Sequence, residues 1–258
     1  RNMPSPQYPV PGAMIDYYLA EAPAGEITLE ILDSDGKTVR RFSSAAAEHA
    51  VREAEQPAGE EEEGGFRFRG GPVRLDKSAG MHRFTWDLRY AGPWLNKNRP
   101  EGPNGPAAVP GNYSVRLTDG AWTSMQPLTI VEDPRISKSG VTMADLQEQF
   151  DHNMRVRELV SDVNKTVARV RAAQADLRSA SGADAGKLNR LNELASHLIT
   201  PPIRYSKPEL QTHITYLYNM TNMADQKIGR DAIERYGVLR KELDQQIAEL
   251  NQILGPEQ

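Results

Sequence analysis

The chain contains the stretch AGMHRFTWDLR at residues 79–89, followed by VPGNYSVRL at residues 109–117. In both stretches apolar and polar side chains alternate, which is the period of two that a half-buried β-strand requires. Trp86 is the largest apolar residue in either stretch, and a tryptophan in such a strand predicts a core position. We therefore expect two strands of an antiparallel fold whose core is built around Trp86.

Further strand candidates lie on both sides of these stretches. Alternation predicts strands at residues 14–20, 26–32, 38–42, 81–88, 112–118 and 122–131. The turn sequence Asp33-Ser34-Asp35-Gly36 joins the second candidate to the third. Short strands with turn signals and no interleaved helix are typical of a β-sandwich, which we place at residues 1–134.

After Pro134 the hydrophobic period changes from two to about 3.6 residues. Helices are predicted from a capping box at 142–145 to about residue 179, at 188–198, from an N-cap at Ser206, and from about residue 231 onward. The simplest arrangement is an antiparallel bundle of about four helices over residues 135–258, with Met220 and Met223 in its core. A dimeric coiled coil through the heptad-like stripe of the last helix is the alternative.

Composition narrows the functional classes. The chain has 258 residues, no cysteine and a formal net charge of -4. The lack of cysteine excludes thiol nucleophiles, thiolate zinc sites and disulfides, and the acidic balance argues against a nucleic-acid partner. The longest apolar stretches are a few residues long, so we expect no membrane span.

Two segments look like loops. Residues 48–63 carry seven glutamates and one arginine, which predicts a disordered acidic loop near residues 45–65. Proline, glycine and asparagine crowd residues 90–108, which predicts an irregular surface loop. Trp94 in this loop either stacks against a sugar or a neighbouring domain, or plugs the base of its own loop. Tyr90 and Trp122 are further candidates for sugar stacking.

We expect no reaction site on this chain. The five histidines form no HxxxH or HExxH pair, and the GxSxG, Walker and dinucleotide-binding glycine motifs are absent. His82 has no second histidine or carboxylate at metal-ligand spacing, so we expect a packed or surface position for it. The sequence predicts no catalytic residue, no cofactor and no metal site.

The two opening stretches also carry a resemblance. Their pattern resembles the Ig-like (immunoglobulin-like) domain of bacterial flagellar hook-capping scaffolds, although residues 90–108 form a longer loop than those scaffolds have. The residues that match are a structural signature: Gly80, His82, Trp86, Asp87, Arg89, Pro110, Gly111 and Tyr113. The resemblance implies that the sandwich of residues 1–134 is Ig-like.

A second resemblance covers nearly the whole chain. It rests on IDYYL at residues 15–19, ITLEI at 27–31, the Trp86 signature, QPL at 126–128 and YSKP at 205–208. These segments are similar to the C-terminal region of bacterial proteins with a sortilin-like or sialidase-like BNR/Asp-box β-propeller, commonly labelled glycosyl hydrolases. Those proteins are exported, so the resemblance implies a secreted or periplasmic location. It also implies that the partner is an upstream β-propeller of the same polypeptide.

The leading hypothesis is a non-catalytic accessory region that packs against or extends such a propeller. The chain has no Ser-x-Asp-x-Gly-x-x-Trp repeat, so any activity of the parent protein is placed upstream, and the chain is interpreted as a fragment of it. One alternative is a carbohydrate-binding module that uses the exposed aromatics. Others are a homo-oligomerisation or partner-docking module acting through the helices, and an enzyme at the domain junction.

Overall fold

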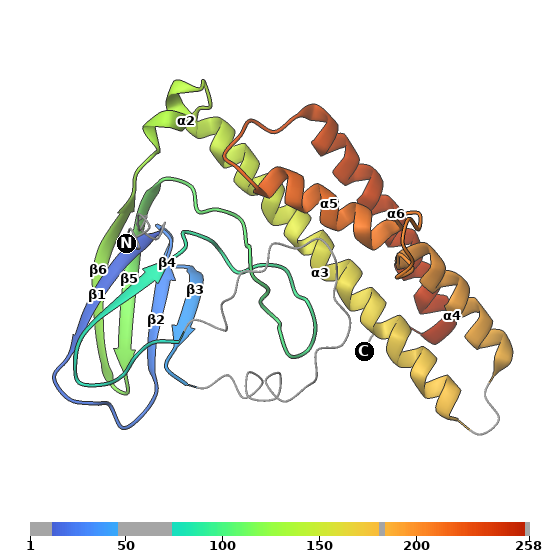
Figure 1. The fold of residues 1–258 in the computed structure, drawn as a ribbon, viewed down its shortest axis with the longest axis horizontal. Helices are drawn as coiled ribbons and strands as arrows, with labels where there is room; N and C mark the ends of the chain where they lie inside the picture. Colours follow the sequence, from blue (N-terminus) through green and yellow to red (C-terminus); the bar gives the residue numbers. More distant parts are fainter. Residues whose placement is uncertain (1–11, 46–73, 181–183, 256–258) are drawn as a thin grey trace, which may run out of the picture. The chain divides into compact units, whose positions relative to one another are not determined.

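The structure, a computed structural model, describes residues 12–45, 74–180 and 184–255 (Figure 1). The chain divides into two compact units. Unit 1 runs to Arg89 and resumes over Pro110–Val131, and unit 2 comprises Tyr90–Val109 and the chain from Glu132 onward. The acidic loop predicted near residues 45–65 falls almost entirely outside the described residues.

The loop at residues 90–108 lies in the second of these units. We expected it in the first domain, and it groups with the helices of unit 2. The physical reason is that its backbone is hydrogen-bonded to two of those helices.

The described residues of unit 1 form six strands in two antiparallel sheets (Figure 1). The two-stranded sheet pairs β1 (Ala13–Leu19) with β4 (Gly80–Trp86). The four-stranded sheet has the order β3 (Thr38–Ser43), β2 (Ile27–Leu32), β5 (Gly111–Asp119) and β6 (Trp122–Ile130). Every observed strand lies within two residues of a predicted one, because alternation of apolar side chains marks the strands directly.

The core of unit 1 lies between the two sheets. Trp86 is fully buried, as the sequence predicts, together with the inward side chains of β2. Ring contacts join the sheets: Phe42 of β3 lies 4.5 Å from Phe84 of β4, and Trp86 lies 6.0 Å from Tyr113 of β5, measured between ring centroids. The predicted antiparallel β-structure is confirmed, whereas the Ig-like assignment stays a prediction.

Unit 2 is helical, as predicted for the second half of the chain. Its helices are α2 (Pro134–Lys138), α3 (Met143–Ser179), α4 (Ala185–Leu198), α5 (Leu210–Asn222) and α6 (Arg230–Leu254). The capping box that opens α3 is confirmed: the Thr142 side chain accepts from the Asp145 backbone, and the Asp145 carboxylate accepts from the Thr142 backbone. No helix in the described residues is both long enough and apolar enough to cross a membrane.

Two local predictions about α5 are wrong. The helix begins at Leu210, and Ser206 is not its N-cap because the Ser206 hydroxyl donates to the backbone oxygen of Pro201 at 2.7 Å. Met220 and Met223 are 49% and 75% exposed rather than buried in the core. Leu217 and Tyr218 fill the buried face of α5 instead.

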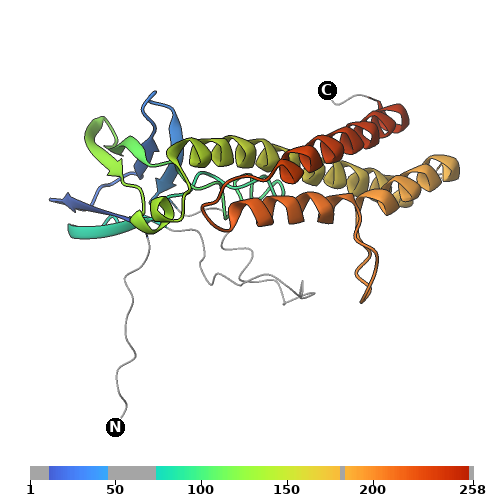
Figure 2. The same cartoon turned by 90° about the horizontal axis from the view of Figure 1, so that it is seen from above.

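The helices do not form the simple antiparallel bundle that we expected. In Figure 2, α4 and α5 lie against the long α3 together with α6. Hydrogen bonds give the directions of the helices. Gln149 and Asn164 of α3 bond to Thr221 and Gln211 of α5, respectively, so α5 runs antiparallel to α3. Asp162 and Arg169 of α3 bond to Arg240 and Asn251 of α6, respectively, so α6 runs parallel to α3. Two consecutive helices, α4 and α5, therefore lead the chain back along α3, where a simple bundle would have one. Pro201-Pro202 lies in the segment that separates them.

Candidate functional site

The sequence signature folds into a corner at the end of β4. The indole Nε1 of buried Trp86 donates to the backbone oxygen of Arg89 at 3.0 Å, and the Asp87 carboxylate accepts from the Arg89 backbone nitrogen at 3.1 Å. Leu88 adopts a φ of 58°, so β4 ends at Trp86 and not at Leu88 as predicted. The polar groups of this corner are used to close the turn over the core.

The rest of the signature also lies in structural positions. Gly80 starts β4 with a φ of 123°, a conformation that favours glycine, and Pro110-Gly111 leads into β5. Tyr113 is buried against Trp86. The His82 ring lies 5.0 Å from the Tyr17 ring, and its Nε2 lies 2.7 Å from the backbone oxygen of Ser78. His82 therefore packs between β1 and the segment that precedes β4.

Residues 90–109, which we call the strap, are fastened to α3 at one end. The Trp94 backbone nitrogen donates to the Ser161 hydroxyl at 3.0 Å, and the Trp94 backbone oxygen accepts from Asn164 Nδ2 at 2.8 Å. Arg157 donates to the backbone oxygen of Ala91 at 3.3 Å. Polar side chains of α3 thus satisfy the irregular backbone of the strap, which cannot form its own regular ladder.

The other end of the strap is fastened to α5. The backbone oxygen of Asn104 accepts from the Tyr218 hydroxyl at 2.8 Å and from Asn222 Nδ2 at 2.9 Å. Gly105 follows at a position where a Cβ atom would overlap the backbone oxygen of Tyr90. Gly105, one of the glycines that predicted a loop, is therefore needed for the close approach of the two backbones.

The three aromatic candidates for sugar stacking belong to different units, Tyr90 and Trp94 to unit 2 and Trp122 to unit 1. Tyr90 packs its ring against Phe150 of α3 at 4.8 Å, and Trp94 is half-buried in the strap. Trp122 belongs to unit 1, at the start of β6, and is 54% exposed.

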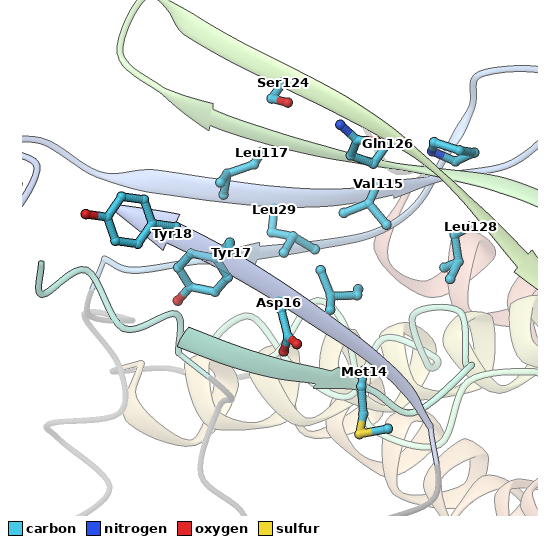
Figure 3. A pocket seen from close by; sticks show the side chains of 12 residues that line it. Met14, Asp16, Tyr17, Tyr18, Leu29, Val115, Leu117, Ser124, Gln126 and Leu128 are labelled. Carbon is cyan, nitrogen blue, oxygen red and sulfur yellow. The ribbon is translucent and has the colours of Figure 1, made fainter. Parts of the chain in front are cut away.

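An apolar groove in unit 1 was not predicted from the sequence. It has a volume of about 340 Å³ and lies between β1 and β6, which are edge strands of the two sheets (Figure 3). Leu29, Val115 and Leu117 lie on the strands beneath it, and Tyr17 and Leu128 contribute from its sides. The alternation in β1 and β5 was the only signal of this groove, and it could not show which edges lie next to each other.

The two edge strands that flank the groove differ in their capacity to pair with a further strand. In the described structure β1 pairs only with β4, and β6 pairs only with β5. Pro127 stands in the middle of β6 and has no backbone N–H, a device that protects sheet edges against further pairing. β1 contains no proline, so its free edge keeps its donors and acceptors.

The charge beside the groove is already paired. Asp16 on β1 accepts from Arg83 on β4 at 2.7 and 2.8 Å, and these hydrogen bonds lower the pKa of the Asp16 carboxyl. With an apolar floor and a neutralised carboxylate, the groove can bury apolar side chains and offer backbone groups along β1. Across the described ranges, no three His, Asp or Glu side chains gather closely enough to hold a metal ion.

No family model matches the chain, and no curated protein matches it either. The resemblance to β-propeller proteins therefore stays a prediction.

Proposed function

We propose that this chain is a non-catalytic accessory region of an exported sialidase-like or sortilin-like β-propeller protein, with an Ig-like sandwich in unit 1 and a helical bundle in unit 2. The groove between β1 and β6 is the observation that carries the proposal. Its apolar floor and the free edge of β1 suit contact with another stretch of polypeptide, because an added strand gains backbone hydrogen bonds and buries alternate side chains.

The proposed occupant is the upstream β-propeller of the same polypeptide. The described chain enters unit 1 at Gly12, one residue before β1 begins at Ala13. Polypeptide on the N-terminal side of Gly12 is thus covalently joined to the start of β1, the strand that forms one wall of the groove. Covalent connection raises the effective concentration of such a partner at the groove.

The contact is tested in a longer protein that includes the upstream coding region. We expect a propeller there, and a single cooperative thermal transition for propeller and unit 1 together. Tyr18→Glu places a charge at the groove on a side chain that is 63% exposed, and should split the transition in two. Thr38→Glu on β3, at the opposite edge of the four-stranded sheet, is the matched control because Thr38 is exposed, and it should leave one transition. An upstream region without a propeller, or a Tyr18→Glu protein that behaves like the control, would contradict the proposal.

The lack of catalysis is tested on the chain itself. Glycoside and sialoside substrates should be hydrolysed no faster than in buffer. Turnover that purifies with the chain would overturn the non-catalytic assignment.

Exposed Trp122 favours a second candidate function, carbohydrate binding. At 54% exposure its side chain is accessible to a sugar, and a tryptophan ring is a large apolar surface for stacking. Glycan binding that is lost in Trp122→Ala and kept in Met125→Ala, a neighbouring side chain of 53% exposure, would support this function. Binding that is equal in both variants would exclude Trp122 as the platform.

A further inference from the structure

The interior of unit 2 contains an unusual histidine. His152 of α3 is fully buried, and neither ring nitrogen has a hydrogen-bond partner among the described residues. Its ring lies edge-on to Tyr236 of α6, with 6.1 Å between centroids. A buried imidazole without an acceptor is tolerated only in its neutral form, because a buried unpaired charge is costly.

The neighbours of His152 on α3 hold the connection between α5 and α6. Gln149 Nε2 donates to the backbone oxygens of Thr221 and Ala224 at 2.8 and 2.7 Å, and its Oε1 accepts from the Gln226 backbone nitrogen at 3.1 Å. Asn153 Nδ2 donates to the same Thr221 oxygen at 3.0 Å. These bonds satisfy carbonyl groups that the end of α5 leaves without helical partners. His152 thus lies between the two side chains that fasten the connector at residues 223–229.

The surroundings of His152 make protonation of its imidazole unfavourable. Burial, and then the positive charge of Arg155, lower the pKa of His152. The Arg155 guanidinium lies 5.5 Å from the centre of the Tyr236 ring, which α6 presents to His152. Helix α5 contains no Asp, Glu, Lys or Arg, and His213 is its only histidine. The charged residues of the connector, Asp225 and Lys227, are exposed.

We propose that His152 is an acid-sensitive latch: a proton taken up by its imidazole expels the ring from the interior of unit 2 and releases the connector between α5 and α6. Expulsion is the expected response because the imidazolium has two N–H donors and no acceptor for them in the described interior, while water accepts from both. Movement of His152 disturbs Gln149 and Asn153, which lie three residues before it and one residue after it on the same helix.

Folding should become less favourable as the pH falls, because His152 is neutral in the folded state. In the unfolded chain His152 takes up a proton near pH 6.5, whereas the folded state resists it, so the unfolded state binds more protons as the pH falls. The folding equilibrium constant should therefore decrease by up to about tenfold for each pH unit below about 6.5, until the lowered pKa of the folded state is reached.

Urea denaturation at pH 7.5 and 5.5 tests the latch on the whole chain. His152→Gln and His152→Phe both remove the proton-binding group, and both should lose most of the decrease in the folding equilibrium constant that the unaltered chain shows. His197→Gln is the matched control, because this histidine is exposed on α4 in the same unit, and it should keep the full decrease. A decrease of equal size in the His152 variants and the control would overturn the proposal.

NMR titration of the unaltered chain gives a test that does not depend on how the variants fold. His152 should titrate below the range of ordinary histidines, and amides of residues 221–229 should lose hydrogen-exchange protection before those of α4. Titration of His152 at or above about pH 6.5, the ordinary value, would overturn the latch. Uniform loss of protection across unit 2 would also contradict it.

Discussion

Asn104 in the strap and Tyr218 in α5 are 114 positions apart in the sequence, and the Tyr218 hydroxyl donates to the Asn104 backbone oxygen at 2.8 Å. Asn104 adopts a φ of 59°, a backbone conformation in which asparagine is more common than most residues. This contact makes the strap part of unit 2 although the chain runs through unit 1 on both sides of it. A division of the protein at residue 134 would separate the strap from the helices that hold it.

Tyr218→Phe tests this contact. The substitution removes only the hydroxyl of a buried side chain, so the free energy of unfolding of unit 2 should fall by about 1 kcal/mol, the net value of one hydrogen bond. Tyr216→Phe on the same helix is the control, since Tyr216 is 64% exposed. Equal stability of the two variants in chemical denaturation would show that the strap is not held by Tyr218.

Gly105→Ala tests how closely the strap packs. A Cβ atom at this position would overlap the backbone oxygen of Tyr90, so the strap must shift, at a cost of about 1–3 kcal/mol in unfolding free energy. Gly25→Ala is the control, because a Cβ atom there has no neighbour within 4 Å in the described structure. If Gly105→Ala unfolds at the same urea concentration as the control, the backbones of residues 90 and 105 do not approach each other closely.

Trp86→Ala tests the core of unit 1. Trp86 is fully buried against Tyr113 and closes the corner at Arg89, so its loss should lower the free energy of unfolding of unit 1 by about 3–5 kcal/mol. Trp122→Ala removes an equally large side chain that is 54% exposed, and should change the unfolding free energy by about 0.5 kcal/mol or less. Near-UV circular dichroism and thermal denaturation distinguish the two outcomes.

The carboxyl of Asp133 should titrate at unusually low pH. Hydrogen bonds from the Arg135 side chain, then from its backbone, lower the pKa of Asp133 to about 2. Because the folded pKa is lowered, the stabilisation is present above the ordinary value near 3.9 and is lost as the pH falls toward 2. Arg135→Gln should raise this pKa in an NMR titration, whereas Lys138→Gln on the same short helix should leave it low. An Asp133 pKa that is the same in Arg135→Gln as in the unaltered chain would contradict the assignment.

Local pattern was enough to find most elements of this protein. Alternation placed the strands because backbone geometry turns successive side chains to opposite faces, so a buried face leaves its mark on every second residue. The start of α3 was predictable for the same kind of reason, since Thr142 and Asp145 are close enough along the chain to cap each other. Ser206 and Glu209 have the same spacing, but there the serine hydroxyl bonds to Pro201, which local spacing does not indicate.

By itself, the sequence determined where the strands and most of the helices lie and that Trp86 is buried, because these follow from side-chain periods along one segment. The tertiary structure alone decided that the strap belongs to the helices, that α6 runs parallel to α3, that β1 and β6 flank a groove, and that His152 has no acceptor among the described residues. Each of these depends on contacts between residues far apart in the chain, and the period of a single segment holds no information about which distant segment covers it.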